Sequence, residues 1–219
     1  MRTLIATLAL VAAAAPLAAQ HNHGHAGAPD PRGGLPAGWH VRLDRADASL
    51  AGVSFAPMGG GFHATTGPAV ILWRAADTGT GEYRATATFA QTRAPAHPEA
   101  YGLFIGGKEL ETAQQDYMYF LVRGDGKYLI KHRAGDAETH TIVDWTEHAA
   151  VNKQDAQGRA SNTLTVEAGE FGVRFLANGT QVAEFLRRDV PYLSTDGIVG
   201  LRVNHNLDVH VSGFAVEKR

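Results

Sequence analysis

The sequence contains no cysteine among its 219 residues, so neither a disulfide framework nor a lipid-modified terminal cysteine is available. Clusters of basic residues are also missing. The formal net charge of −2 gives no reason to expect nucleic acid or an anionic membrane as a partner. Heptads are absent, and no segment longer than about two turns has a helical period. The folded domain must therefore be held by a hydrophobic core alone, and strands must supply that core.

The first residues have the layout of a secretory signal peptide. Arg2 is the single charged residue, an uncharged run follows over 3–11, and small residues occupy 12–19. The apolar core is too short to span a bilayer well, which makes a retained membrane anchor the weaker alternative. We therefore predict a signal peptide over 1–19 and a secreted or periplasmic protein of the bacterial envelope, with no transmembrane segment after cleavage.

Residues 20–37 are rich in histidine, glycine and proline, and this composition predicts a flexible leader. His21, His23 and His25 alternate close to the expected new N-terminus. Neutral imidazole and an α-amino group are good ligands for Cu²⁺, Ni²⁺ and Zn²⁺. No neighbouring residue completes a structural metal site. We expect a solvated tail with adventitious metal affinity, and a true chelating site is the alternative.

The clearest local signal is an antiparallel hairpin. Two apolar runs, 117–122 and 127–133, flank Gly124-Asp125-Gly126, whose glycines accept the positive φ of a tight turn. The first run is apolar on both faces, as expected for a strand buried between two layers. The second alternates, as expected for a strand nearer the edge of a sheet.

Apolar runs of the same kind recur throughout 38–219, which has the size of one domain. They cover 39–43, 53–55, 62–65, 69–73, 83–89, 101–105, 139–145, 163–167, 171–175, 180–185, 198–203 and 207–216. Asn178-Gly179 predicts a two-residue hairpin turn, and a change of phase across Ser212-Gly213 predicts a bulge or bend. About a dozen strands in one domain predict an all-β fold, a two-sheet antiparallel β-sandwich.

Several of these segments resemble one superfamily. The run 115–133, the strand Val143-Asp144-Trp145, and the segments 162–167 and 175–183 are similar to the concanavalin A-like lectin/glucanase superfamily. Within it they most resemble secreted bacterial jelly-roll domains of the 3-keto-disaccharide hydrolase-like and laminin-G-like kind. The resemblance covers about half of the domain 38–219, from Tyr101 to Phe185. It implies a jelly roll, and it rests on positions that make the fold more than on positions that make a site.

The resemblance implies two kinds of chemistry. Glucanases of the superfamily use two carboxylates on one strand, about 5–5.5 Å apart in retaining enzymes. No strand here has that motif, so we assign no catalytic residue and name only the acidic candidates Glu109, Asp116 and Asp144. Calcium at loop tips is the second implication, with Asp125 as the candidate. One aspartate supplies few of the roughly six to eight oxygens that calcium needs, so we expect no cofactor.

Sugar binding requires an aromatic plate together with side chains that hydrogen-bond hydroxyl groups. For Tyr117 and Trp145 the alternative is packing in the core or on a sheet face. The candidate ligand-binding residues are Tyr101, Tyr117, Tyr128, His132, Arg133 and Trp145.

Three functions remain open at this point. The favoured one, by analogy of fold, is a non-catalytic protein that binds a carbohydrate or glycan. The second is a sugar-active hydrolase or lyase of the 3-keto-disaccharide hydrolase-like type, which requires two carboxyl groups in one pocket. The third is a periplasmic interaction subunit that docks on a larger envelope complex through a sheet face.

Overall fold

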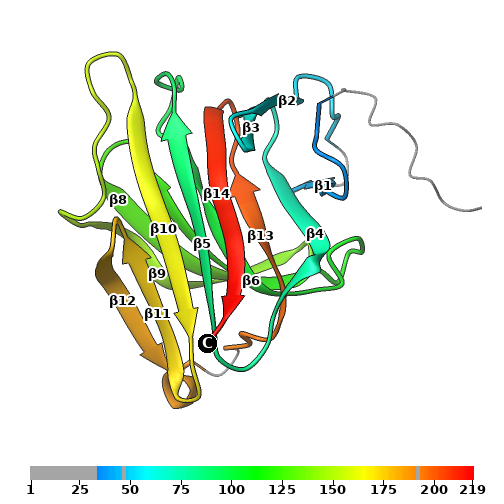
Figure 1. The fold of residues 1–219 in the computed structure, drawn as a ribbon, viewed down its shortest axis with the longest axis vertical. Coiled ribbons are helices and arrows are strands. Elements are labelled where there is room, and N and C mark those ends of the chain that lie inside the picture. The colour runs from blue at the N-terminus through cyan, green and yellow to red at the C-terminus, as the bar shows by residue number, and fades with distance from the viewer. Residues whose placement is uncertain (1–33, 46–47, 191–192) are drawn as a thin grey trace, which may run out of the picture.

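The computed structural model describes residues 34–45, 48–190 and 193–219. Within these ranges fourteen strands form two antiparallel seven-stranded sheets that pack face to face, and a single 3₁₀ turn, η1 (Arg187–Asp189), is the one helical element (Figure 1). The predicted all-β sandwich is therefore confirmed. The predicted signal peptide, most of the leader, and His21, His23 and His25 lie outside the described residues.

The two sheets are called sheet A and sheet B. Sheet A has the strand order β1-β4-β13-β6-β7-β8-β9, and sheet B has the order β12-β11-β10-β5-β14-β3-β2. In chain order the strands are β1 (His40–Leu43), β2 (Ser54–Met58), β3 (Gly61–Thr65), β4 (Val70–Gly79), β5 (Tyr83–Gln91), β6 (Ala100–Lys108), β7 (Asp116–Arg123), β8 (Lys127–Ala134), β9 (Glu138–Glu147), β10 (Ala160–Ala168), β11 (Gly172–Ala177), β12 (Thr180–Leu186), β13 (Gly197–Val203) and β14 (Asp208–Lys218). Because β4, β6 and β13 lie in sheet A while β5 and β14 lie in sheet B, the chain passes repeatedly between the layers.

The predicted turns are present. Strands β7 and β8 form the central hairpin, and Gly126 in its turn has φ +85°. Asn178 and Gly179, between β11 and β12, have φ +51° and +82°, the left-handed conformation that a two-residue hairpin turn requires at both positions. The bulge is also confirmed, because the register of β14 against β5 shifts between Ser212 and Ala215.

The main core lies between the two sheets. Phe120 of sheet A contacts Phe175 of sheet B edge to face, with ring centroids 5.4 Å apart, and both side chains are fully buried. On β5 the small residues Ala85 and Ala87 are also buried, which fits the close approach of the opposing layer. These contacts join strands that are far apart in the sequence, so they hold the sandwich together.

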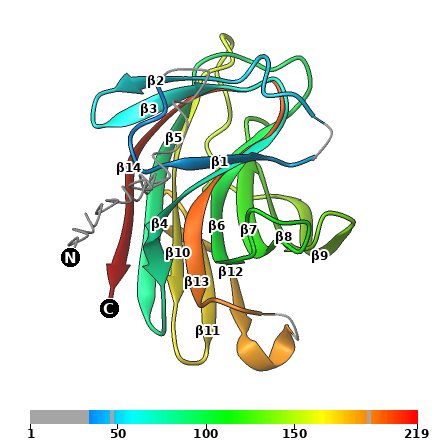
Figure 2. The same ribbon diagram turned by 90° about the vertical axis from the view of Figure 1, so that its right-hand side faces the viewer.

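Sheet A carries a second apolar cluster on its outer face, away from sheet B. Its largest members are Ile71, Trp73, Phe104, Tyr117, Tyr119, Leu121 and Leu129. These alternate with the side chains of the inter-sheet core, as the two faces of a strand require. Strand β1, drawn in front of the other strands of sheet A in Figure 2, is the edge strand beside β4, and the contacts described below tie the chain after it to β8. The outer face of sheet A is therefore partly covered by its own chain.

No helix in the described part of the chain is both long enough and apolar enough to cross a membrane.

Candidate functional site

An arginine–tyrosine cluster occupies the outer face of sheet A, and Arg202 on β13 is its centre. The guanidinium of Arg202 donates from Nη1 and Nη2 to the two carboxylate oxygens of Asp44, at 2.8 and 2.9 Å. Nη1 also contacts the hydroxyl oxygen of Tyr117 at 2.9 Å, and the guanidinium carbon lies 4.9 Å from the ring centroid of Tyr119. Only 7% of the Arg202 side chain is exposed. A charge buried this deeply requires such paired hydrogen bonds.

Two further arginines extend the cluster and tie its loops together. Arg42 on β1 donates to the carboxylate of Asp136, in the β8–β9 turn, at 2.8 Å. Gln115, just before β7, donates to the same oxygen at 2.6 Å. Arg133 on β8 donates to the backbone carbonyls of Asp44 and Asp136, at 3.2 and 3.1 Å. The chain after β1, the start of β7 and the β8–β9 turn are therefore held to one another over the face of the sheet.

The cluster contains more positive than negative charge. Arg42, Arg133 and Arg202 share the two carboxylates of Asp44 and Asp136. Three donor atoms remain buried without a hydrogen-bond partner among the described residues: Arg42 Nη1, Arg133 Nε and Arg202 Nε. Buried donors are normally satisfied by protein, water or ligand. Because the three atoms are themselves buried, a ligand on this face would meet the partly exposed side chains around the cluster first.

The pKa of Asp44 reflects this environment. Burial alone would raise it, but the hydrogen bonds from Arg202 and the charges of Arg202, Arg133 and His205 outweigh burial and lower the pKa of Asp44 to about 2. Since the native pKa lies below that of the unfolded chain, the ionised carboxylate stabilises the fold at neutral pH.

We expect this stabilisation to disappear in acid. Asp44 contributes about 2 kcal/mol, which is fully present above about pH 5 and is lost as the pH falls through the unfolded-state pKa near 4 towards 2. The free energy of unfolding, measured with denaturant from pH 7 to pH 2, should fall more steeply in the wild type than in Asp44→Asn. Parallel pH profiles for the two proteins would contradict the assignment.

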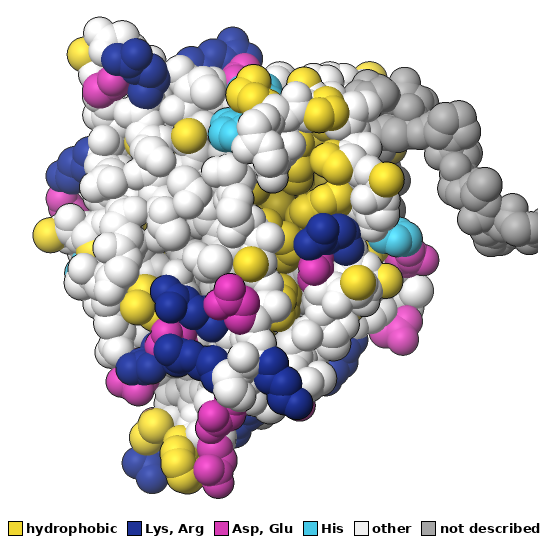
Figure 3. All heavy atoms as spheres, in the orientation of Figure 1, with side chains coloured by type: hydrophobic (Ala, Val, Ile, Leu, Met, Phe, Trp, Pro, Cys, Tyr) yellow, Lys and Arg dark blue, Asp and Glu magenta, His cyan; other side chains and the backbone are white. Residues whose placement is uncertain are grey.

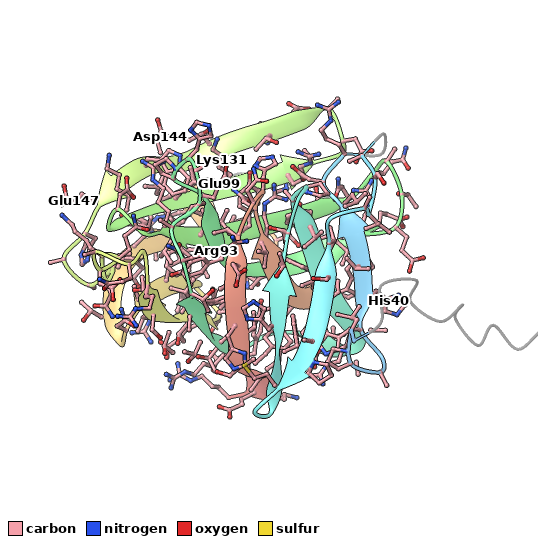
Figure 4. All side chains as sticks on the ribbon, turned by 90° about the horizontal axis from the view of Figure 1, so that it is seen from above. His40, Arg93, Glu99, Lys131, Asp144 and Glu147 are labelled. Carbon is pink, nitrogen blue, oxygen red and sulfur yellow. The ribbon has the colours of Figure 1, made fainter. Side chains whose placement is uncertain are left out.

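Partly exposed side chains surround the cluster. Lys131 on β8 lies directly across from Tyr119 on β7 and is partly exposed. Trp145 on β9 packs against the apolar outer-face cluster, and the guanidinium of Arg123 lies 4.2 Å from its ring centroid. Figure 4 shows Lys131 on the side of the sheet formed by β8 and β9, and His40 on the opposite side, on β1. An aromatic plate and cationic donors thus lie on one face.

The structure separates the six predicted ligand-binding residues. Tyr117, Arg133 and Trp145 lie on the outer face of sheet A. Tyr101 and Tyr128 instead belong to the inter-sheet core.

The two core tyrosines have structural partners. Tyr101 stacks on Phe89 and accepts a hydrogen bond from Asn162 at 3.2 Å, and Tyr128 donates to the carbonyl oxygen of Val182 at 2.9 Å. Their side chains are 0% and 6% exposed, so these rings offer no surface to a ligand.

His132 is also buried, in a chain of side chains on the other face of β8. Its Nε2 lies 3.1 Å from a carboxylate oxygen of Asp116, and its Nδ1 lies 3.2 Å from Nδ1 of His140. Nε2 of His140 lies 2.7 Å from the carboxylate of Glu138. The acidic candidate Asp116 is therefore the partner of a buried imidazole, away from the arginine–tyrosine cluster.

The other two acidic candidates have different surroundings. Asp144 is exposed, and its carboxylate accepts a hydrogen bond from the backbone N–H of Trp145 at 2.8 Å. Glu109, in the β6–β7 connection, lines a hollow of about 300 Å³ together with Glu111, Trp73 and His40. The imidazole of His40 stacks on Trp73 with ring centroids 5.4 Å apart. This hollow does bring two carboxylates beside an aromatic ring.

The described residues contain no group of three histidine, aspartate or glutamate side chains placed to hold a metal ion. Asp125, the candidate calcium ligand, accepts a hydrogen bond from Arg123 at 2.8 Å within its turn. The candidate chelators His21, His23 and His25 lie outside the described residues, so chelation by the leader stays a prediction.

Sequence reasoning missed Asp44, Arg42 and Arg202. Arg202 left one signal, because it is the only charged residue in the apolar run 198–203. A lone charge within a strand that is otherwise buried on both faces indicates a buried ionic partner. Nothing in the sequence identified Asp44 as that partner, because 158 positions separate the two residues.

Comparison with known proteins identifies the fold and leaves the family open. No family model matches the sequence, and no curated protein matches it. Solved structures do match. The carbohydrate-binding module CBM66 from Bacillus subtilis has a TM-score of 0.57 at 11% identity, covering 83% of this chain and 96% of that one.

Two further solved structures resemble this chain in fold. A Bacillus subtilis protein of unknown function with a galectin-like fold has a TM-score of 0.58 at 13% identity, covering 82% of this chain and 89% of that one. A glycoside hydrolase family 16 endo-glucanase from Bacteroides ovatus has a TM-score of 0.56 at 7% identity, covering 85% and 98%. At such identities the likeness concerns the fold alone. The chain therefore has a concanavalin A-like β-sandwich, the fold of these carbohydrate-binding and carbohydrate-cleaving proteins.

Proposed function

We propose that this protein is a secreted or periplasmic, non-catalytic carbohydrate-binding protein that holds its ligand on the outer face of sheet A. The observation that carries the proposal is the partly exposed ring of Trp145 and the partly exposed amine of Lys131 on one face, above the arginine–tyrosine cluster that holds this face in place. Sugars present an apolar ring face and a rim of hydroxyl oxygens, which suit an aromatic plate and fixed donors respectively. The concanavalin A-like fold supports the same ligand class by analogy.

The positions of the carboxylates favour binding over catalysis. A glycosidase needs two carboxyl groups in one site, with one of them kept protonated by desolvation. The cluster holds Asp44 and Asp136, and each is already bound by arginine as a carboxylate. Neither is free to deliver a proton to a leaving group.

One observation favours the hydrolase alternative. Glu109 and Glu111 line the same hollow as Trp73, which is the pairing that such an enzyme requires. However, the side chain of Glu111 is 72% exposed and lies 3.4 Å from Nδ1 of His40. An exposed carboxylate of this kind lacks the desolvated surroundings of a general acid. Catalysis at this hollow is therefore only the second candidate, behind carbohydrate binding.

Removing the aromatic plate should weaken binding. In a titration calorimeter, with neutral and uronate-containing oligosaccharides as probes, Trp145→Ala and Lys131→Ala should each raise the dissociation constant of the best probe by about tenfold, or about 1.4 kcal/mol. Phe171→Ala is the matched control, because Phe171 is 74% exposed in the β10–β11 turn and belongs to neither site. It should bind like the wild type.

The same mixtures separate the two candidates. Under the proposal the probe is recovered intact, and Glu109→Gln/Glu111→Gln binds and releases it like the wild type. Release of reducing sugar that disappears in this double variant would overturn the non-catalytic assignment in favour of the hydrolase. Equal affinities of Trp145→Ala, Lys131→Ala and wild type would show that the ligand does not bind on the outer face of sheet A.

A further inference from the structure

A second hollow lies between the two sheets, at the edge of the sandwich formed by β4 and β14. This groove has a volume of about 520 Å³, larger than the hollow at Trp73. Its lining comes from the residues before β1, the β2–β3 turn, β4 and the bulge of β14. Figure 3 shows the apolar hollow on this face, with basic and acidic side chains beside it. The principal lining residues are Trp39, Met58, Arg74 and Phe214, with the glycine turn at 59–61.

The groove exists because neighbouring strands stop short. Strand β1 pairs with β4 only over Val70–Trp73, although β4 continues to Gly79. Strand β3 pairs with β14 only over Asp208–Val211, although β14 continues to Lys218. Beyond these points, no described strand covers this side of β4 or β14. The bulge and the glycine turn keep the space between them open.

The groove is separate from the outer face of sheet A. Side chains of consecutive residues in a strand point to opposite faces. His40 and Trp73 therefore face the outer hollow, whereas Trp39 and Arg74 line the groove. The strand pair β1–β4 is the wall between the two spaces.

Aromatic rings form one side of the groove. The ring of Trp39 lies between Phe62 and Phe214, with centroid distances of 5.3 and 5.4 Å. The guanidinium carbon of Arg74 lies 5.2 Å from the ring centroid of Trp39 and 5.8 Å from that of Phe214. Stacking of this kind fixes the position of the guanidinium.

A fixed polar pair accompanies the rings. Arg74 donates from Nη2 to Oδ1 of Asp77 at 2.9 Å and from Nε to the other carboxylate oxygen. This bidentate contact uses two of its three nitrogens and leaves Nη1 for a ligand oxygen. The Arg74 side chain is 38% exposed, so solvent reaches it. Gly59 and Gly60 are also exposed, so the backbone of their turn is accessible to a ligand.

We propose that this groove is a second binding site, for a neutral saccharide. Trp39 and Phe214 match the apolar face of a sugar ring, and Arg74 and the glycine-turn backbone match its hydroxyl groups. The lining contains one charged side chain, Arg74, and Asp77 already neutralises it, so the groove selects an uncharged ligand. Its volume falls within the roughly 300–1,000 Å³ of small-ligand sites.

Amide chemical shifts test the site directly. The ¹⁵N-labelled mature protein is titrated with cellotetraose, laminaritetraose, maltotetraose and xylotetraose. At least one of these probes should shift the amides of Gly60, Gly61 and Gly213. Arg74→Ala should weaken that binding by about tenfold. Phe214→Ala should also weaken it, because it removes one of the two rings that match the apolar face of the sugar.

The control is Lys131→Ala, which changes the outer face of sheet A and should leave the groove titration unaltered. The inference is overturned if no probe shifts the groove amides, or if both groove variants bind like the wild type. Shifts confined to the outer face of sheet A would show that the groove is not a binding site, and the proposed function would still stand.

Discussion

Replacing Arg202 by methionine should lower the free energy of unfolding by about 3–5 kcal/mol. Methionine removes both hydrogen bonds to Asp44, the contact with Tyr117 and the stacking on Tyr119. It leaves the carboxylate of Asp44 without its principal partner, and an unpaired buried charge is costly. Equilibrium unfolding in urea at pH 7 measures the loss.

Two further variants show whether the loss comes from the buried pair. Arg188→Met is the matched control, because the Arg188 side chain is 80% exposed, and it should change the stability by no more than about 0.5 kcal/mol. The double variant Asp44→Asn/Arg202→Met should lose less than the sum of the two single variants, since it leaves no uncompensated charge. A loss below about 1 kcal/mol in Arg202→Met would show that the cluster does not stabilise the fold.

Truncating Phe120 to alanine should cost about 3–5 kcal/mol. Phe120 is fully buried and contacts Phe175 of the other sheet and Tyr128 of its own sheet, with ring centroids 5.4 and 6.3 Å apart. Its removal leaves a cavity at the contact between the two layers, and the chain has no disulfide to compensate. Thermal and urea unfolding both measure this change.

The exposed Phe171 again supplies the control. Phe171→Ala removes the same side chain from a position that is 74% exposed, and it should change the stability by no more than about 0.5 kcal/mol. If Phe120→Ala were as mild as Phe171→Ala, the two sheets would not be joined through this ring.

The fold was predictable because its signals are local. Alternation along each run defines a strand, and Asn178-Gly179 defines a turn through the backbone conformation of those two residues alone. The bulge in β14 could be predicted for the same reason, since a change of phase at Ser212-Gly213 must be absorbed where it occurs.

The site was less predictable because both faces of sheet A are buried. In β6, Tyr101 and Leu103 belong to the core shared with sheet B while Phe104 belongs to the outer-face cluster, and all three are buried. Residue type therefore does not tell which tyrosines face a ligand. Sequence reasoning places Tyr101 on the binding face for this reason, although the ring packs in the core.

The contact between Arg202 and Asp44 depends on the order of the strands in sheet A. Arg202 reaches Asp44 because β13 lies between β4 and β6, with Arg202 opposite Ile71 on one side and Gly102 on the other. Strand β4 in turn pairs with β1, and Asp44 directly follows β1. Such a pairing depends on contacts between distant segments, which a local pattern does not encode.

Carbohydrate binding by the outer face of sheet A is tested most directly by a map of amide shifts. The ¹⁵N-labelled protein, titrated with the best-binding oligosaccharide of the neutral and uronate-containing panel, should show saturable shifts at Tyr119, Lys131 and Trp145. Lys131→Ala should move those shifts to about tenfold higher ligand concentration. Saturable binding that leaves these three amides unshifted, or no binding to any member of the panel, would contradict it.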